Sequence, residues 1–269
     1  MNKIVLSLFG IVFFCVQGFG QTDTVATSKT DTVFNKANIV ITISPKNKIK
    51  DRFKSNKLKK NITTHRWVID LGFSNYVDYS NYPMANAWNL VGLGVDKERM
   101  EVNDRKLTNV NIWFFRKKIN LIQHIVNLKY GAGLELNNYR FKDAGIYFQK
   151  SFRIISYQPL SEVKKVKLAV DYFTVPISLN FNFTPNTKKE IGFSGGVSLG
   201  YLYSARFKSK THREIHKVKD DFNLNRWKLS YIGEVSLGRT SIYGSYAFRD
   251  MWANELNMLP FTIGVRLGH

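Results

Sequence analysis

From residue 66 onward, apolar and polar side chains alternate with a period of two over long stretches of the chain. Successive side chains of a β-strand point to opposite faces, so this period places the apolar residues of each stretch on one face. The clearest stretches are 67–74, 126–137, 173–183, 191–203, 227–237 and 261–267, and weaker ones lie at 109–116 and 241–249. Because no helical period competes with this pattern over long windows, the sequence predicts an all-β fold with eight strands.

The length and polar faces of these strands favour a transmembrane barrel over a soluble sandwich. Several exceed the roughly 5–6 residues usual in soluble sheets and match the roughly 9–11 needed to cross a bilayer obliquely. Their polar faces carry mainly Gly, Ser and Asn, which suits the crowded lumen of a narrow barrel whose apolar face meets lipid. A mean hydropathy of −0.23 fits this fold, because each spanning strand is only half apolar. A soluble lipocalin-like barrel, with its apolar faces inward, is the alternative fold.

The connections between the predicted strands alternate between long and short. Residues 75–105, 142–165 and 208–224 form long connections, residues 117–123, 184–189 and 238–240 form short ones, and residues 250–259 are intermediate. Outer-membrane barrels have short periplasmic turns and longer external loops. The pattern therefore predicts an up-and-down antiparallel barrel with both termini in the periplasm. Residues 145–157 could form a hairpin above the membrane or add two strands to give ten, and Pro176 is expected to mark a bulge.

Aromatic residues gather near the predicted strand ends, where amphipathic rings favour the depth of the lipid headgroups. Those near the long connections are Tyr76, Tyr79, Tyr82, Trp88, Tyr139, Tyr203 and Trp252. Those near the short connections are Phe114, Phe181, Phe183 and Phe193. Two aromatic girdles are one interpretation, and the ordinary preference of aromatic residues for strands is the other.

The N-terminus has the three parts of a secretory signal peptide. Lys3 precedes an apolar run at residues 4–16, and Gly18 and Gly20 stand at positions −3 and −1 of a cut before Gln21. The predicted organisation is a signal peptide at 1–20, a periplasmic tail with a basic linker at 21–64, and an outer-membrane β-barrel at 65–269. Cys15 is the single cysteine, so the mature chain is expected to hold neither a disulfide nor a thiolate metal site.

The formal net charge is +20. Export argues against a nucleic-acid partner, so we expect contact with anionic surfaces, namely outer-membrane lipid and lipopolysaccharide, and with other envelope proteins through the loops or the tail. Part of the charge lies in the basic linker, whose predicted surface-contact residues are Lys46, Lys48, Lys50, Arg52, Lys54, Lys57, Lys59 and Lys60.

Charged residues on the polar faces of the strands are the candidates for the lumen. They are Asp70, Lys129, Glu135, Lys228, Glu234, Arg249 and Arg266. Side chains just fill an eight-stranded barrel, and opposite charges inside it would pair because isolated buried charges are costly. A filled lumen is therefore expected, with a small solute path lined by these residues as the alternative.

Signals for catalysis are weak. His212 and His216 are spaced i, i+4 in a basic connection, which fits a solvated loop better than a metal site. The sequence contains neither a nucleophile elbow nor a phosphate-binding loop. No catalytic residue, metal or cofactor is therefore predicted, and a lipid-modifying enzyme ranks third, behind an interaction barrel and a passive channel.

Two adjacent stretches resemble a known family. FTVPISLNF at 173–181 is followed, after a polar turn, by GGVSLGYLYSARFK at 195–208 and then by Asp220–Asp221–Phe222. This pattern resembles the PorT-like family of bacterial outer-membrane β-barrel proteins over residues 65–269. The resemblance implies a barrel in the outer membrane and makes Pro176 a family feature. Some members are linked to type IX secretion and most have no known function, so the resemblance bears on architecture more than on activity. A structural or interaction barrel, associated with type IX secretion as some members are, is the expected function.

Overall fold

The computed structural model describes residues 60–87, 91–103, 108–149, 154–159, 162–185, 187, 189–253 and 256–267. These residues belong to one compact unit, Lys57–His269. The predicted signal peptide and the predicted tail up to residue 59 lie outside the described residues.

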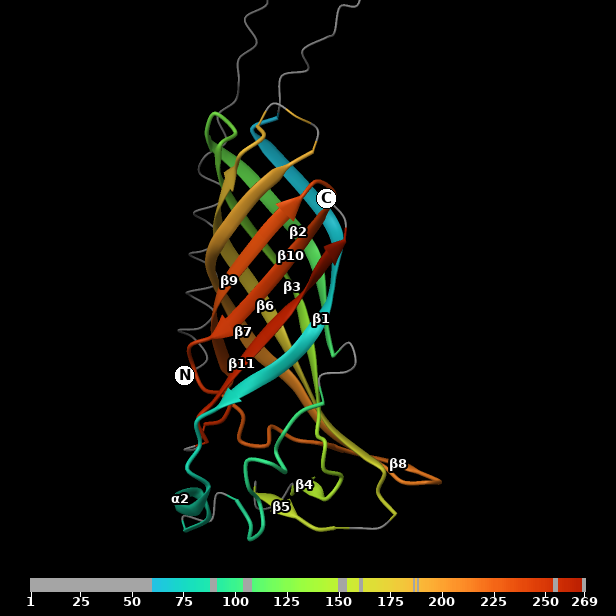
Figure 1. Cartoon of the computed structure of the whole chain (residues 1–269). Coiled ribbons are helices and arrows are strands. Elements are labelled where there is room, and N and C mark those ends of the chain that lie inside the picture. Colours follow the sequence, from blue (N-terminus) through green and yellow to red (C-terminus); the bar gives the residue numbers. More distant parts are fainter. Residues whose placement is uncertain are drawn as a thin grey trace, which may run out of the picture. The chain divides into compact units, whose positions relative to one another are not determined.

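Eight long strands form a closed antiparallel barrel (Figure 1). They are β1 (Ile62–Asp78), β2 (Asn109–Ile122), β3 (Val126–Arg140), β6 (Lys165–Asn182), β7 (Ile191–Lys210), β9 (Trp227–Leu237), β10 (Thr240–Ala247) and β11 (Met258–Leu267). Each pairs with the next barrel strand along the chain, and β1 closes the barrel by pairing with β11. The predicted eight-stranded up-and-down barrel is confirmed.

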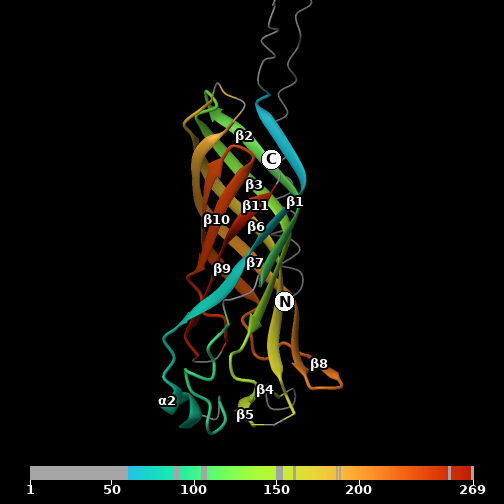
Figure 2. The same cartoon turned by 45° about the vertical axis from the view of Figure 1, so that its right-hand side comes forward.

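The remaining elements lie in the long connections at one end of the barrel (Figures 1 and 2). They are helix α2 (Tyr82–Ala87) and the strands β4 (Ile146–Phe148), β5 (Ile155–Tyr157) and β8 (Ile215–Lys219). Strands β4 and β5 pair only with each other as a two-stranded sheet. The expected hairpin at 145–157 therefore forms outside the barrel wall and does not raise the strand number to ten. The short turns lie at the opposite end, together with the start of β1 and the end of β11.

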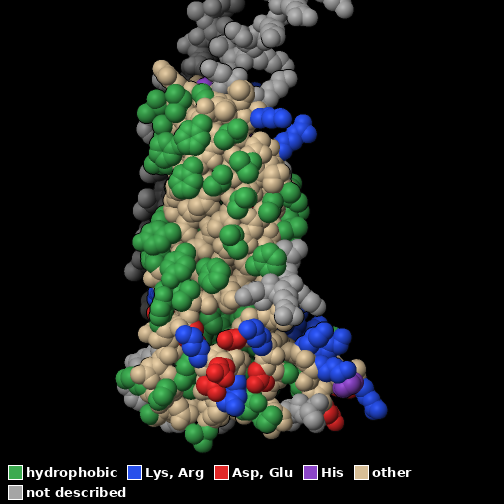
Figure 3. Space-filling view, viewed as in Figure 1, with side chains coloured by type: hydrophobic (Ala, Val, Ile, Leu, Met, Phe, Trp, Pro, Cys, Tyr) green, Lys and Arg blue, Asp and Glu red, His purple; other side chains and the backbone are tan. Residues whose placement is uncertain are grey.

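The alternating pattern turns apolar residues outward and small polar residues inward. Trp67, Ile177, Val197 and Ile263 are exposed on the outer wall, as are many similar side chains, and Figure 3 shows these hydrophobic groups spread over the barrel surface. Asn, Ser and Thr side chains from the same strands are buried inside. This polarity is the reverse of a soluble barrel, whose apolar face would fill the interior.

Close contact between strands requires glycine inside the wall. Gly72 of β1 lies opposite Gly264 of β11, and the ring of Tyr243 packs over both. A Cβ atom added at Gly72 would lie 2.7 Å from the Tyr243 Oη atom and 2.9 Å from the Gly264 Cα atom. Larger residues at these positions would have to displace Tyr243 or the backbone.

The bulge expected at Pro176 is absent. Pro176 pairs in register with Ser198 of β7, while the pairing of β6 with β3 passes from Ile177 to Thr174 without a change of register. Proline has no N–H to donate, so it weakens the ladder locally without requiring an extra residue. The irregularity of the β6–β7 pair lies instead between Asp171 and Tyr172.

The long connections fold over the barrel end as a hydrophobic cluster, the loop cap. Its buried loop residues are Tyr82, Ala85, Val91, Val95, Met100, Val102, Phe141, Ile146, Phe148, Ile155, Phe222, Leu224, Met251, Trp252 and Leu256. They pack on the inner faces of β3, β6 and β7. Phe148 lies at the centre, stacked on Trp252 at 5.7 Å and 5.1 Å from the ring of Phe207.

The girdle interpretation is wrong for four of the aromatic residues near this end. Tyr76 is half-buried against the cluster, and its hydroxyl donates to the Met100 carbonyl oxygen. Tyr82, Tyr139 and Trp252 are buried in the cluster, because Tyr139 lies on the inner face of β3 and the loops fold back over the barrel mouth. Burial, together with the hydrogen bond that the Tyr82 hydroxyl donates to Asp78, raises the pKa of Tyr82 above its ordinary value. Tyr79 and Tyr203 are exposed, and Trp88 lies outside the described residues.

Candidate functional site

Most of the candidate lumen charges lie inside the barrel. Asp70 on β1, Lys129 and Glu135 on β3, Lys228 and Glu234 on β9 and Arg266 on β11 are all buried, each at most 8% exposed. The prediction that Arg249 is a lumen residue is wrong. Strand β10 ends at Ala247, so the chain has already left the wall at Arg249, which is exposed.

The barrel closure brings Arg266 against Asp70. The Arg266 Nε and Nη2 atoms donate to the two Asp70 carboxylate oxygens, at 2.7 Å each. Trp113 Nε1 donates to the same carboxylate at 2.6 Å, and the guanidinium lies 5.4 Å from the centre of the Tyr243 ring. This bidentate pair joins the first and last barrel strands and fixes both side chains.

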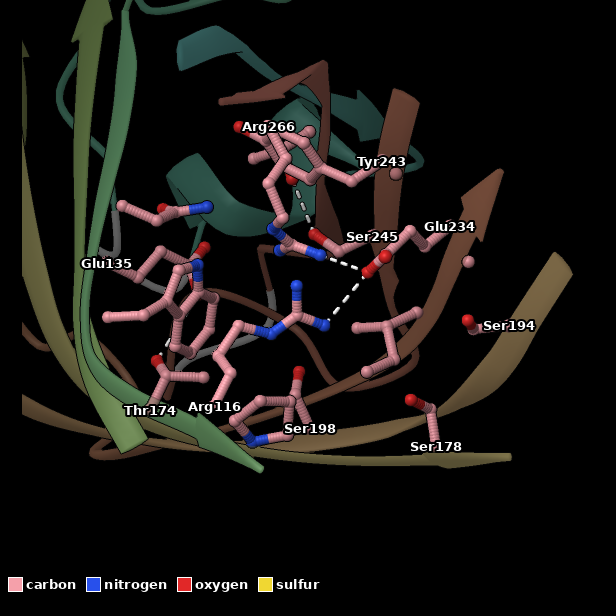
Figure 4. A pocket seen from close by; sticks show the side chains of 17 residues that line it. Arg116, Glu135, Thr174, Ser178, Ser194, Ser198, Glu234, Tyr243, Ser245 and Arg266 are labelled. Carbon is pink, nitrogen blue, oxygen red and sulfur yellow. Dashed lines mark hydrogen bonds and ion pairs between the residues drawn. The ribbon is translucent and has the colours of Figure 1, made fainter. Parts of the chain in front are cut away.

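Glu234 accepts hydrogen bonds from three cations, of which Figure 4 shows Arg116 and Arg266. Arg266 Nη1 and Arg116 Nη2 both donate to Oε2, the latter at 2.9 Å, and Lys129 Nζ donates to Oε1 at 3.1 Å. Because Arg266 also holds Asp70, strands β1, β2, β3, β9 and β11 are linked across the lumen. We call Asp70, Arg116, Lys129, Glu234 and Arg266 the central ion network.

Arg116 was not among the predicted lumen charges. A bulge between Trp113 and Phe115 in the β2–β3 pair shifts the inward face of β2 from odd to even positions. Arg116 and Lys118 consequently turn inward, and Lys118 Nζ donates to Glu190 at 2.6 Å. The available sequence signal was the Phe114–Phe115 doublet, where the alternation of the strand breaks.

A second pair lies toward the loop cap. Lys228 forms a salt bridge with Glu135, which also accepts hydrogen bonds from Asn137 Nδ2 at 3.1 Å and from Thr174 Oγ1 at 3.3 Å. Lys228 Nζ lies 5.5 Å from the centre of the Tyr172 ring, which belongs to the hydrophobic cluster under the loop cap. The lumen therefore changes from ionic to apolar as it approaches the loops.

The free space in the barrel is unevenly distributed. A cavity of about 50 Å³ lies beside the central ion network, between Arg116, Glu234 and Arg266. A wider polar pocket of about 350 Å³ lies at the short-turn end, where His65, Lys118 and Glu190 line it. The pocket is thus separated from the loops by the central ion network, by the Lys228–Glu135 pair and by the loop cap.

The remaining candidate residues do not assemble a reactive centre. His212 lies in the turn before β8 and His216 lies on β8, both exposed, with His216 Nε2 3.3 Å from Glu214 Oε2. Within the described ranges, no three His, Cys, Asp or Glu residues are grouped as metal ligands would be. His269 and the predicted contact residues Lys46 to Lys59 fall outside those ranges, and Lys60 is exposed at the rim of the wider pocket. In the part of the chain that the structure describes, no helix is long and apolar enough to cross a bilayer.

Comparison with known proteins identifies a family. The family model described as "Outer membrane protein beta-barrel domain" matches residues 35–252. Among solved structures, the chain is similar to Ail, the attachment invasion locus protein of Yersinia pestis, with 10% identity and a TM-score of 0.30 over 75% of this chain and 97% of that one. No curated protein matches the sequence.

Proposed function

The chain belongs to the outer membrane protein β-barrel domain family, and we propose that within it this protein is a non-conducting, non-enzymatic interaction barrel. Its lumen is filled, and its loop cap and N-terminal tail carry the binding surfaces. The partners we propose are outer-membrane lipid, lipopolysaccharide and other envelope proteins.

The observation that carries this proposal is the central ion network. An eight-stranded barrel encloses a space that side chains just fill, and here charged groups from five strands meet across it. Opening a path would leave buried charges without partners, at a cost of several kcal/mol per broken pair. The buried carboxylates are engaged by Arg and Lys, which also supports a structural rather than a catalytic role for them.

We further propose that the loop cap lies outside the cell and that both termini lie in the periplasm. The support is the segregation of long connections to one barrel end and short turns to the other. Single cysteines at Lys142 and Lys189, which are exposed at opposite ends, test this orientation in a chain whose Cys15 is removed with the signal peptide. An impermeant maleimide applied to intact cells should label position 142 and spare position 189, and the reverse pattern would contradict the orientation.

The PorT-like assignment and an association with type IX secretion belong to the same proposal. Their support is the sequence of β6 and β7, the two longest strands, in which Pro176 faces the lumen opposite Ser198. Affinity capture of the detergent-solubilised protein tests this association: recovery of secretion-machinery proteins supports it, and their absence from the captured fraction counts against it.

Planar-bilayer conductance tests the filled lumen. The wild-type barrel should give no stable conductance step, whereas a variant with Arg116, Glu234 and Arg266 all changed to Ser should give small steps. Stable steps from the wild-type protein would instead support the alternative, a small passive channel entered from the wider polar pocket. Heat modifiability on gels verifies that both proteins are folded.

A further inference from the structure

Three strands continue past the barrel mouth as a small sheet. Beyond the irregularity at Asp171, β6 pairs with β7 from Lys165↔Lys210 to Val170↔Ala205, and β8 pairs along the outer edge of β7. The inward face of this sheet is apolar and packs on the loop cap through Leu168 and Phe207. The hydrophobic cluster that holds the loops together therefore also holds this sheet in place.

The opposite, outward face is strongly cationic. Its members, which we call the basic sheet face, are Lys165, Lys167, Arg206, Lys208, Lys210, Lys217 and Lys219. They stand in register: Lys165 lies opposite Lys210, Lys208 lies between Lys167 and Lys217, and Arg206 lies opposite Lys219. Like charges placed directly opposite on neighbouring strands destabilise a sheet.

Among the residues that the structure describes, few anionic groups offset this repulsion. Arg206 forms a salt bridge with Asp171, and Lys167 Nζ donates to Asn138 Oδ1 at 3.0 Å. Lys165, Lys210, Lys217 and Lys219 are exposed. The arrangement is one that an external polyanion would stabilise.

The position of the basic sheet face indicates which kind of polyanion it would bind. On the outer wall of the barrel, which we call the apolar belt, Phe173 of β6 and Tyr201 and Tyr203 of β7 lie nearest to the basic sheet face. On β6 the buried Asp171 and Ala169 separate Phe173 from Lys167, and on β7 Arg206 follows Tyr203 closely, so the positive charge begins near the end of the apolar belt. Figures 1 and 2 both show β8 standing out to the side of the barrel, and Figure 3 shows the Lys and Arg side chains gathered there, next to the belt. A wall that bends away from the barrel axis turns its outward face toward the membrane.

We propose that the basic sheet face binds the phosphate groups of the glycolipid in the outer leaflet, as carried by lipopolysaccharide. Neighbouring strands are about 4.8 Å apart, so ammonium groups from three strands can approach one phosphorylated headgroup together. The lipid phosphates would offset the repulsion between opposed lysines, and the apolar belt would hold the acyl chains beside them. This inference rests on the proposed outward orientation of the loop cap.

The test compares two triple variants of the full mature chain. K165Q/K208Q/K217Q removes one cation from each strand of the basic sheet face. K97Q/K142Q/K189Q removes the same charge from exposed residues elsewhere. Each protein is reconstituted in nanodiscs that contain phosphorylated or dephosphorylated lipid A, and the lipid A that co-purifies in detergent is measured.

The wild type and the control variant should retain phosphorylated lipid A. The basic-face variant should retain at least about tenfold less, because each Lys or Arg near an anionic lipid surface adds to the binding affinity. In zwitterionic detergent without lipid A, the basic-face variant should be at least as heat-stable as the wild type, because repulsion between opposed lysines has been removed. Equal retention of phosphorylated lipid A by the two variants would overturn the proposal. The proposal would also fail if the wild type retained dephosphorylated lipid A as well as the phosphorylated form.

Two further measurements keep the proposal testable if the variant folds poorly. Retention by the wild type should fall severalfold when salt rises from 0.05 to 0.5 M, because salt screens exposed charges; retention independent of salt would overturn it. Soluble inositol hexakisphosphate should bind far more weakly than the lipid, and equal binding would argue for a soluble anion instead. Conductance and cysteine labelling report on the proposed function separately, so either proposal can fail alone.

Discussion

Replacing Glu234 by Gln is the most direct perturbation of the central ion network. The change keeps the side-chain volume and removes the charge that Arg116, Lys129 and Arg266 share. The side chains of Glu234 and Arg266 are each 6% exposed, and that of Arg116 is 13% exposed. Removing one partner of a buried pair typically costs about 3–5 kcal/mol, because the remaining charge is left unpaired.

The surviving contacts show which cation loses most. Arg266 keeps its bidentate bond to Asp70, and Lys129 keeps Ser194 Oγ at 3.2 Å. Arg116 loses its carboxylate partner and contributes most of the cost. We therefore expect Glu234→Gln to lower the free energy of unfolding by about 3–5 kcal/mol.

The assay is urea unfolding of the barrel in lipid vesicles, followed by tryptophan fluorescence. Trp113 is a suitable reporter because its indole donates to Asp70 inside the network. Glu101→Gln is the matched control: it breaks the salt bridge to Lys142 at the surface, where the two side chains are 50% and 57% exposed. A surface pair of this kind is worth about 0–1 kcal/mol.

A double variant separates the network from a general effect of the substitution. Changing Arg116 to Gln as well removes the unpaired cation, so the combined loss should be smaller than the sum of the two single losses by about 0.5–3 kcal/mol. If Glu234→Gln costs no more than Glu101→Gln, or if the losses from Glu234→Gln and Arg116→Gln simply add, the central ion network does not stabilise the closed barrel.

Three further outcomes follow from the same contacts. Gly264→Val should abolish the folded band on heat-modifiability gels, because a Cβ atom there would lie 2.6 Å from the Gly72 Cα atom and 2.8 Å from Tyr243 Cε1. Phe148→Ala should destabilise the loop cap by about 3–5 kcal/mol, seen as faster proteolysis of the loops while the barrel band persists; equal loss of both would show that cap and barrel unfold together. Arg249→Gln should change the free energy of unfolding by less than about 0.5 kcal/mol, whereas Arg266→Gln should cost about 3–5 kcal/mol, as measured by urea unfolding.

Local pattern was sufficient to predict the wall of the barrel. The side chain of each wall residue faces either lipid or lumen, so the alternation of apolar and polar residues along a strand shows which way each side chain points. The strand containing 191–203 was predicted from alternating glycine and apolar residues, and β7 contains it whole. The hairpin at 145–157 was found for the same reason, although its place outside the wall followed only from the pairing of β4 with β5.

The errors came from places where a period of two is interrupted or ends. The bulge at Phe114 changed which residues of β2 face inward and so hid Arg116. The prediction for Arg249 is wrong because the alternating pattern of the sequence continues past Ala247, where β10 ends. Neither interpretation of the aromatic residues predicts the burial of Tyr82 and Trp252, because nothing in the loop sequence marks them as part of a hydrophobic core that forms only when the loops meet.

The sequence by itself determined the fold class and the polar character of the lumen, since both depend on neighbours close along the chain. It favoured eight strands, and only the pairing of β4 with β5 outside the wall excluded ten. The partners of each buried charge were decided only by the tertiary structure. Asp70 and Arg266 are 196 positions apart, and they meet because the first strand closes on the last. Which charges face each other across a barrel depends on the stagger between strands, and closure of the whole wall fixes that stagger.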